Sequence, residues 1–345
     1  MLAIDNETAF AELVRKYEDQ WVAIDDREGV KFIVGSGKDA VEAAQAVATK
    51  GKPRKRGNSD ALWGFTFLLP QLIGLLLFSI IPLISVFYLS MASWNGLGPI
   101  TFVGLQNFID QFQSSDLHIA LLNTLAYTAI AVPGGLFLAL LIALGLNNVR
   151  GKTVYRVLYF MPFITGSVAV GVIWSLLLNS DFGLFNSILR SVFHAKGVGW
   201  LTDPRFVIPS IALVGIWQGL GFNMIILLAG LQGIPVSYSE AARMDGANKF
   251  QLFWNVTLPM LTPTIFFCTV ISILSSFQVF DLTFILTGGG PGKDSYTMVY
   301  HIYHLGFETS TFGPASAAAV ILFVILLTLT GFQFRLQKRW VNYDV

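Results

Sequence analysis

Six long apolar segments constrain the fold of this chain more than any other feature of its sequence. Each is long enough to cross a hydrocarbon core about 30 Å thick. Hydrophobic residues make up 54% of the 345 positions and charged residues only 12%, a composition typical of membrane proteins. We therefore predict an all-α polytopic membrane domain over residues 62–340. Its transmembrane helices are expected at residues 62–91, 121–146, 155–178, 208–232, 259–286 and 314–334. The first is over-long and contains Pro70 and Pro82, so it should be kinked or tilted.

The distribution of Lys and Arg orients these spans. If the N-terminus is cytoplasmic, the inner segments carry thirteen basic residues and the outer segments four. An excess of basic residues marks the cytoplasmic side, so both termini and the loop of residues 233–258 are predicted to lie there. The basic linker at residues 50–61 is interpreted as a topology signal. Binding of lipid headgroups or nucleic acid is the weaker interpretation.

Residues 1–49 differ from the rest of the chain in charge. They hold ten acidic and five basic residues, which indicates a small soluble cytoplasmic domain. We expect an α+β arrangement, with helices near 10–17 and 39–50 and a hairpin formed by strands at 21–24 and 30–34. The acidic start does not fit a signal peptide. A passive fused domain is favoured over a regulatory or docking domain.

Residues 233–258 form the one sizeable polar loop on their side of the membrane. Ser237 and Glu240 make an S-x-x-E pattern, so a helix is expected to start there with a capping box. Gly246 can take a left-handed conformation and end that helix. A second short helix with aromatic residues on one face should follow, and Pro259 suits the first turn of the next span. The pattern predicts a helix-turn-helix outside the bilayer, either a docking knob or a plain connector.

This loop resembles the cytoplasmic coupling loop of binding-protein-dependent ABC importer permeases. The similarity rests on Glu240-Ala241-Ala242, then Gly246, then Leu258-Pro259. Matches elsewhere agree in order and resemble the first permease subunit of the sugar-importer branch (the maltose and glycerol-phosphate type). They are Phe102-Val-Gly-Leu-x-Asn107-Phe, Asn123-Thr, Tyr159-Phe-Met-Pro162, Leu228-Ala-Gly-Leu-Gln-x-Ile-Pro235 and Thr287-Gly-Gly-Gly-Pro291.

The resemblance implies a type I ABC importer permease fold in a bacterial or archaeal cell membrane. It implies partners as well: ATPase subunits that bind the ATP, a second permease subunit, and an extracytoplasmic solute-binding protein that delivers a sugar. No cofactor, nucleic acid or catalytic residue is expected on this chain. The residues implied to couple it to the ATPase are Glu240, Ala241, Ala242, Asp245, Gly246, Leu258 and Pro259.

Neutral polar and aromatic residues on the fourth and fifth spans are the candidates for the substrate pathway. They are Gln218, Phe222, Asn223, Ser272 and Ser276. Positions 218 and 222 share one helix face, as do 272 and 276. Sugars are bound by neutral hydrogen-bonding groups and by aromatic faces, and the resemblance places the pathway on these two helices. The alternative is that these side chains only join helices by hydrogen bonds.

The outer side offers two further candidates. Asp281 is the only acid or base expected well inside a span, where it is either functional or merely positioned near the interface, and the second interpretation is favoured. Residues 287–292 form a glycine-rich segment that we expect to be a flexible outer loop. By resemblance, Gly289, Gly290 and Pro291 lie near the docking surface for the external binding protein. A plain loop is the alternative.

Other classes of protein receive less support. His301 and His304 have no evident third ligand, so no metal site is expected, and Cys268 is alone. No Walker motif, nucleophile elbow or H-E-x-x-H is found. A secondary carrier or channel acting alone remains an alternative, although one membrane acid and no inverted repeat argue against it. Another alternative is a membrane sensor or scaffold whose soluble N-terminal domain carries the output signal. Glycerol phosphate remains an alternative substrate, mildly disfavoured because the candidate pathway holds no basic residue.

Overall fold

The computed structural model describes residues 3–4, 21–27, 30–38, 58–147, 149 and 151–342. They belong to two compact units, residues 1–80 and residues 81–345. In the first unit, β2 (Trp21–Arg27) and β3 (Val30–Gly37) pair antiparallel, and β1 (Ala3–Ile4) joins the other edge of β3. The strands agree with the predicted hairpin but run further. The α+β domain is not confirmed, because the helices expected at 10–17 and 39–50 lie outside the described residues.

The first predicted span is a helical run in three parts. They are α3 (Asn58–Leu75), the π-helical turn η1 (Leu76–Ile80) and α4 (Ile81–Ser90). Pro70 lies inside α3, and η1 falls between Pro70 and Pro82, where an irregularity was expected. A π-turn inserts an extra residue into the helical repeat, so the disturbance takes this form here. The segment Phe65–Ser90 is long and apolar enough to cross a membrane.

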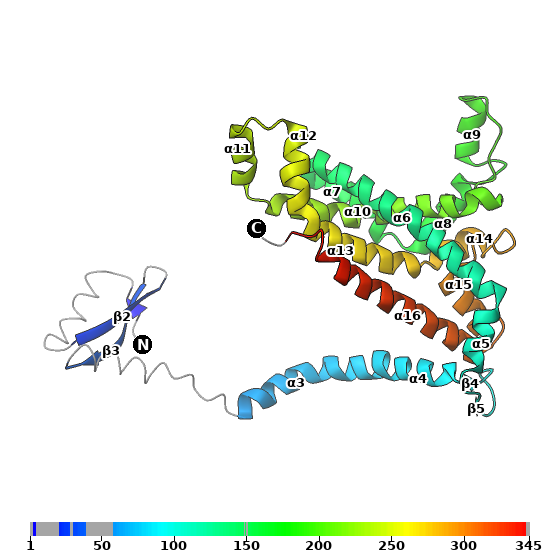
Figure 1. The fold of residues 1–345 in the computed structure, drawn as a ribbon, viewed down its shortest axis with the longest axis horizontal. Helices are drawn as coiled ribbons and strands as arrows, with labels where there is room; N and C mark the ends of the chain where they lie inside the picture. Colours follow the sequence, from blue (N-terminus) through cyan, green and yellow to red (C-terminus); the bar gives the residue numbers. More distant parts are fainter. Residues whose placement is uncertain are drawn as a thin grey trace. The chain divides into compact units, whose positions relative to one another are not determined.

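Four long helices form the framework of the second unit (Figure 1). They are α6 (Ser115–Asn147), α10 (Pro204–Gly233), α13 (Leu258–Phe277) and α16 (Phe312–Gln337). The helix α6 packs along α10, α13 packs against both, and α16 packs against α4 and α13. With Phe65–Ser90, these bring to five the helical runs in the described part of the chain that are long and apolar enough to span a bilayer.

The third predicted span is not one straight helix. It consists of α7 (Lys152–Ile164) and α8 (Ser167–Leu177), bent by 93°. Between them Thr165 has extended backbone (ψ 132°), so the helical hydrogen-bond ladder stops there. Pro162 lies in the last turn before this break, and a proline removes one backbone donor. The prediction of one continuous span over 155–178 is therefore wrong; the pair makes a sixth span only if the two helices are counted as one.

The fifth predicted span ends earlier than expected. The long helix α13 stops at Phe277, and a separate short helix, α14 (Asp281–Thr287), follows after a break. Val279 and Leu282 are buried in a core cluster with Trp174 of α8. Burial against another helix therefore turns the chain where apolar sequence alone indicated a continuing span. The prediction of a single helix over 259–286 is wrong in this respect.

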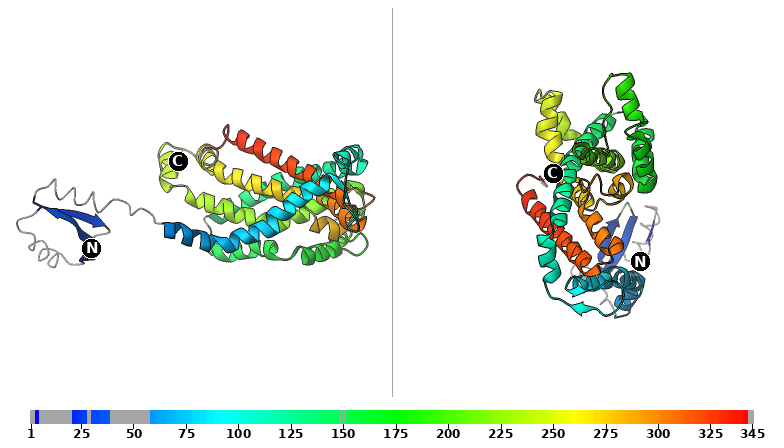
Figure 2. Two further views of the ribbon diagram at one scale, coloured as in Figure 1. Left: turned by 90° about the horizontal axis from the view of Figure 1, so that it is seen from below. Right: turned by 90° about the vertical axis from the view of Figure 1, so that its right-hand side faces the viewer.

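The second unit has two distinct ends, which all the long helices connect (Figures 1 and 2). At one end lie α11 (Val236–Met244), α12 (Lys249–Leu252), the π-turn η2 (Phe253–Thr257) and the C-terminal end of α16. At the opposite end lie β4 (Ala92–Ser93), β5 (Thr101–Phe102), α5 (Gln106–Gln113), α9 (Leu184–Ser191), α14, α15 (Met298–Tyr303) and the π-turn η3 (His304–Glu308).

Candidate functional site: a polar cavity between two loops

A cavity of about 480 Å³ lies within the second unit, with α10 and α13 providing much of its wall. All five predicted pathway residues line it. They are Gln218, Phe222 and Asn223 of α10 and Ser272 and Ser276 of α13. The i, i+4 spacing placed each pair on one helix face, and the packing of α10 against α13 turns the two faces toward the same space.

These side chains also bond across helices. The Asn223 Nδ2 atom donates to Ser272 Oγ at 3.2 Å, and Ser276 Oγ lies 3.0 Å from Thr128 Oγ1 of α6. Gln218 Nε2 donates to the Thr165 carbonyl at 3.4 Å. A place in the substrate pathway and a role in joining helices by hydrogen bonds are therefore compatible for these residues. The same groups that join the helices present their remaining hydrogen-bonding capacity to the cavity.

Aromatic rings supply the apolar part of the cavity wall. The Phe222 ring stacks on the Phe163 ring with centroids 5.0 Å apart and planes 21° from parallel. Phe163 comes from the last turn of α7, just before the 93° bend, and sequence reasoning missed it. The bend also brings Ser167 of α8 to the lining. The signals that could have indicated this contribution are Pro162 and Gly166, which bracket the break.

Two glycines of α10 act differently at this site. A Cβ atom on Gly221 would overlap the Tyr159 carbonyl group and the Phe160 backbone of α7, so α7 and α10 can cross here only because position 221 has no side chain. Gly219 has open space around it and lines the cavity. Close helix packing therefore explains Gly221, whereas Gly219 leaves room inside the cavity.

The charge of the cavity is set by Asp281. Asp281 was expected inside a long helix. Because α13 ends at Phe277, it instead begins α14 and lines the cavity. Gln278 and Phe280, in the break before α14, line it as well. No Lys, Arg or His is among the described residues that line it. The wall thus combines apolar and uncharged polar groups with one carboxylate.

The loop at the opposite end from α14 is a helix-turn-helix, as predicted. However, α11 begins at Val236 after Pro235, and no side chain caps it. The capping box expected from Ser237 and Glu240 is therefore absent: Ser237 already lies inside the first turn, where it cannot serve as N-cap. The capping box that does form joins Asn248 and Gln251 at the start of α12.

Gly246 makes the turn between the two helices. Its φ is +83°, in the left-handed region that glycine adopts without strain, and its N–H donates to the Arg243 carbonyl at 3.0 Å. A Cβ atom there would meet no neighbour. Glu240, Ala241 and Asp245 are exposed as well, and Ala242 is half-buried.

The last two residues of the predicted coupling set lie where the loop meets the membrane helix. Leu258 and Pro259 are half-buried in the first turn of α13. This turn continues α12 and η2 as one helical run, Lys249–Phe277. A movement of the loop would therefore reach α13 through continuous helix.

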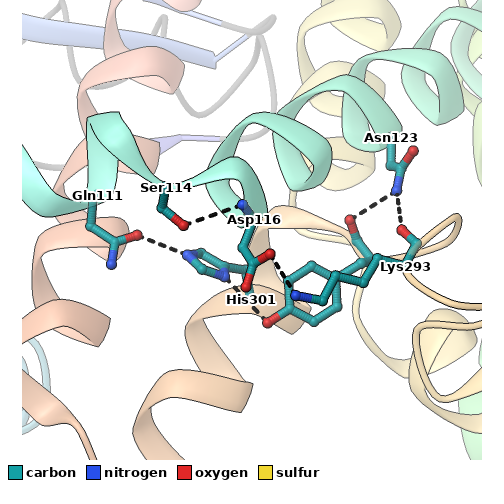
Figure 3. A network of polar contacts seen from close by, with 7 residues as sticks. Gln111, Ser114, Asp116, Asn123, Lys293 and His301 are labelled. Atoms are coloured by element: carbon teal, nitrogen blue, oxygen red, sulfur yellow. Dashed lines mark hydrogen bonds and ion pairs between the residues drawn. The ribbon is translucent and has the colours of Figure 1, made fainter.

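The outer loop at residues 288–297 is tied to the rest of the unit. Asn123 of α6 donates to the carbonyls of Lys293 (2.8 Å) and Tyr296 (3.2 Å), and the Lys293 ammonium contacts the Asp116 carboxylate at 2.5 Å. Figure 3 shows these side chains meeting from α6 and the loop. Tyr300 Oη also donates to the Gly288 carbonyl. The glycine-rich segment 287–292, expected to be flexible, thus belongs to a loop that makes several hydrogen bonds to the rest of the unit.

The three predicted docking residues lie within this anchored loop. Gly289 is buried beneath the rings of Tyr296 and Tyr300, whereas Gly290 and Pro291 are partly exposed. The Gly290 carbonyl accepts a hydrogen bond from Ser295 Oγ at 2.6 Å. The loop thus offers a short backbone surface of fixed shape.

A buried histidine completes the anchoring. His301 of α15 has Nε2 2.8 Å from Gln111 Oε1 and Nδ1 3.2 Å from the Tyr296 hydroxyl (Figure 3). Burial disfavours the charged ring and lowers the pKa of His301 from its usual 6.5 to about 4. The neutral imidazole therefore joins α5, α15 and the outer loop near neutral pH.

A helix bundle with a cavity lined by polar and aromatic side chains, an exposed loop at one end and an anchored loop at the other fits a membrane transport subunit. Residues 131–342 match the family model described as the binding-protein-dependent transport system inner membrane component. The chain belongs to this family and is a multi-pass inner-membrane protein. The family inferred from the coupling-loop motifs is thereby confirmed.

Several known proteins are similar over nearly their whole length. The probable ABC transporter permease protein YesP of Bacillus subtilis (strain 168) is 35% identical over 317 residues, which cover 90% of this chain and 99% of YesP. The sn-glycerol-3-phosphate transport system permease protein UgpA of Agrobacterium fabrum (strain C58 / ATCC 33970) is 33% identical over 284 residues, 81% of this chain and 96% of UgpA.

A solved structure has the same fold. It is a chain of a bacterial alginate ABC transporter in complex with an alginate pentasaccharide-bound periplasmic protein. The TM-score is 0.73 at 25% identity, and the alignment covers 85% of this chain and 100% of the other. The described helices of this chain thus follow the fold of an ABC importer permease.

Proposed function

We propose that this chain is one of two permease subunits of an ATP-driven importer for a carbohydrate, an oligosaccharide or a related sugar. The observation that carries the proposal is the cavity of about 480 Å³ in which all five predicted pathway residues meet. Its wall combines neutral hydrogen-bonding groups with aromatic faces, the chemistry that suits uncharged polyols. In this proposal Gln218, Phe222, Asn223, Ser272 and Ser276 contact the passing substrate.

Energy for transport comes from partner subunits, because no ATP-binding motif is found in this sequence. The proposed contact with an ATPase is the α11–α12 loop, with Glu240, Asp245 and Gly246 at its exposed surface. When the ATPase domains close on ATP, the loop moves with them, and the continuous run from α12 to α13 carries that motion to the cavity wall. A two-state change of access needs a rigid element of this kind between its two sites.

The opposite end of the unit receives the substrate. We propose that an external binding protein docks near Gly289, Gly290 and Pro291, whose loop is held in a fixed shape by α6 and α15. The solved alginate transporter was captured with its periplasmic protein, which supports such a partner here. This arrangement places both termini in the cytoplasm, as the Lys and Arg distribution predicts. It counts α7 and α8 together as one of six spans.

A carbohydrate is favoured over glycerol phosphate as the substrate. UgpA shows that a relative is named for glycerol phosphate, so the alternative has support from similarity. The described cavity lining, however, contains Asp281 and no basic side chain. A phosphate dianion placed there would face a carboxylate without a compensating charge, which is unfavourable in a site of low dielectric constant.

The first experiment is to purify the tagged chain in mild detergent and identify what purifies with it by mass spectrometry. An ATPase subunit and a second permease are expected. A co-purifying binding protein can then be screened directly for its sugar. A chain that purifies alone, and stays alone after crosslinking in membranes, would favour an autonomous carrier or a sensor. Deleting residues 1–49 distinguishes an importer from a sensor, because an importer should largely keep its transport activity without them.

A further inference from the structure

Six aromatic rings form a continuous row at the outer end of the second unit. The aromatic row consists of Phe280, Phe284, Tyr303, Phe307, Phe312 and Trp94. From Phe280 to Tyr303 the ring centroids are 5.0 Å apart, and from Tyr303 to Phe307 they are 5.5 Å apart. The row continues to Phe312 at 6.4 Å and to Trp94 at 5.2 Å. Phe284 lies beside its start, 5.4 Å from Tyr303.

The row begins at the cavity. Phe280 is part of the cavity lining, together with Asp281 and Gln278. The other rings continue from it over α14, α15, η3 and the segment before β5. They are also accessible: Phe307 is 73% exposed and Phe284 41% exposed in this chain, while the remaining rings of the row are partly buried. Accessible apolar surface of this kind is typical of a binding site or an interface rather than of a closed core.

Hydrogen-bonding groups run beside the rings. His304 and Glu308 of η3 form a pair at 2.6 Å, and both are partly exposed. Thr309 and Ser310 follow at the exposed end of η3. Aromatic faces flanked by carboxylate, hydroxyl and imidazole groups match the two surfaces of a pyranose ring, whose C–H groups stack and whose hydroxyls bond.

The outer part of the row is held in place before any ligand arrives. The Phe312 N–H donates to the Trp94 carbonyl at 3.0 Å, and the Phe312 ring lies over Gly96, where a Cβ atom would come within 2.7 Å of it. Tyr303 and Phe307 stand one helical turn apart across the start of η3, and π-turns occur frequently at functional sites. Rigid rings lose little conformational entropy when a ligand stacks on them.

We propose that the aromatic row is a carbohydrate-binding path that leads the pyranose rings of an oligosaccharide into the cavity. The inference rests on the proposed import function and makes its substrate more specific. A row of several rings gains from a ligand with several sugar units, whereas glycerol phosphate has no ring to stack. The predicted substrate is therefore an oligosaccharide, bound more tightly as its chain lengthens up to the length of the row.

The test uses the complete transporter, purified with its partner subunits in nanodiscs. Saturation-transfer NMR is recorded with malto-, cello- and alginate-derived oligosaccharides of two to five units as probes. At least one series should show transfer that grows with chain length. Phe307→Leu and Tyr303→Leu should weaken the binding by about two- to tenfold, the range of a single aromatic stacking contact. Phe307→Trp should retain it.

Leucine is the informative substitution because it keeps an apolar surface without a ring. If the aromatic row instead packs against the second permease or lipid, Phe307→Leu should behave as wild type, and the proposal fails. It also fails if no series binds to the wild type. The matched control is Phe193→Ala, which removes an equally exposed phenylalanine (68%) outside the row and should change nothing.

Uptake into proteoliposomes with the cognate binding protein tests the aromatic row and the proposed import function separately. If the wild type shows no ATP-driven uptake, the proposed import function itself is wrong. Normal ATP-driven uptake that is equal for wild type and Phe307→Leu at low substrate concentration would leave the import function in place and overturn only the aromatic row.

Discussion

The two loops at opposite ends of the bundle look alike in sequence, since each holds glycine and proline and joins two helices, yet they are built in opposite ways. In the described part of the chain, every hydrogen bond of residues 236–252 joins residues five or fewer apart. The outer loop bonds to α6 across 170 to 177 residues of sequence.

This difference fits the two tasks proposed for the loops. A loop that must move with a partner subunit cannot be bonded firmly to its own bundle, so its helix-turn-helix is held by local bonds only. A loop that offers a fixed surface next to the cavity benefits from long-range anchors, because these remove its freedom before a partner arrives. The exposed Met244 of α11, 89% accessible, is consistent with a surface left for a partner.

The strongest test of the inner loop is Gly246→Asp, which should abolish uptake while the chain still inserts at normal levels. The variant places a side chain in a left-handed turn and adds charge to the surface proposed to meet the ATPase. Gly98→Asp is the matched control, because Gly98 lies in the outer segment with a similar φ of +80° and open space around it. Glu240→Lys should also stop uptake. Normal uptake by Gly246→Asp and Glu240→Lys would end the coupling role.

Acid should weaken the anchored end of the bundle. The pKa of His301 is about 4 in the folded protein, whereas an unfolded histidine titrates near 6.5. Between these values the unfolded state holds a proton that the folded state does not. The stability from this site is therefore fully present above pH 6.5 and is lost as pH falls toward 4, by up to about 1.4 kcal/mol per pH unit.

Hydrogen exchange can locate this acid effect. Between pH 7 and pH 5, residues 288–303 should lose protection while residues 236–252 do not, once intrinsic exchange rates are taken into account. In His301→Gln the extra pH dependence should vanish. Equal pH dependence in wild type and His301→Gln would show that this histidine is not what makes the anchored end sensitive to acid.

The anchor at Asn123 should matter more than its counterpart in the inner loop. Asn123→Ala leaves two loop carbonyls without their donor, so we expect a loss of about 1–3 kcal/mol and faster exchange over residues 288–297. Asn248→Ala removes the cap of α12 and should cost about 1 kcal/mol, felt only locally. If both variants lower the thermal midpoint of the whole protein equally, the contrast between the loops is wrong.

The ion pair of the outer loop should contribute least. Lys293 and Asp116 are both partly exposed, 46% and 32% for their side chains, and exposed pairs contribute about 0.2–1 kcal/mol. Asp116→Asn should therefore shift the thermal midpoint only slightly, and high salt should abolish the difference from wild type. A shift as large as that of Asn123→Ala would mean that this pair, rather than the amide anchor, holds the loop.

The sequence was informative wherever one physical signal dominated. Hydrophobic length predicted the long helices, although α6 begins six residues before the expected 121. Neutral polar residues at i, i+4 predicted which faces of α10 and α13 look inward, and the five candidates do line one cavity. Their contact with substrate stays a prediction. Gly246 was predicted to end α11, and its φ of +83° agrees.

Other features depended on partners far away in the chain. Nothing local indicated that α13 would stop at Phe277, because its end is decided by the burial of Val279 and Leu282 beside Trp174. The contribution of Phe163 to the cavity follows from the 93° bend between α7 and α8. The cap of α11 was misplaced because S-x-x-E describes only a preference. The helix already begins at Val236, with Pro235 at the N-cap position two residues before Ser237.

By itself, the sequence determined that the chain crosses a membrane several times and which family it resembles, and it predicted which residues of α10 and α13 line the cavity. Those properties follow from local composition and spacing, since bilayer thickness and helix periodicity act on each segment separately. Only the tertiary structure decided that the glycine-rich outer loop is anchored, that Asp281 faces the cavity and that six aromatic rings form one row. Such properties arise from contacts between segments up to about two hundred residues apart, and local preference carries no information about which segments will meet.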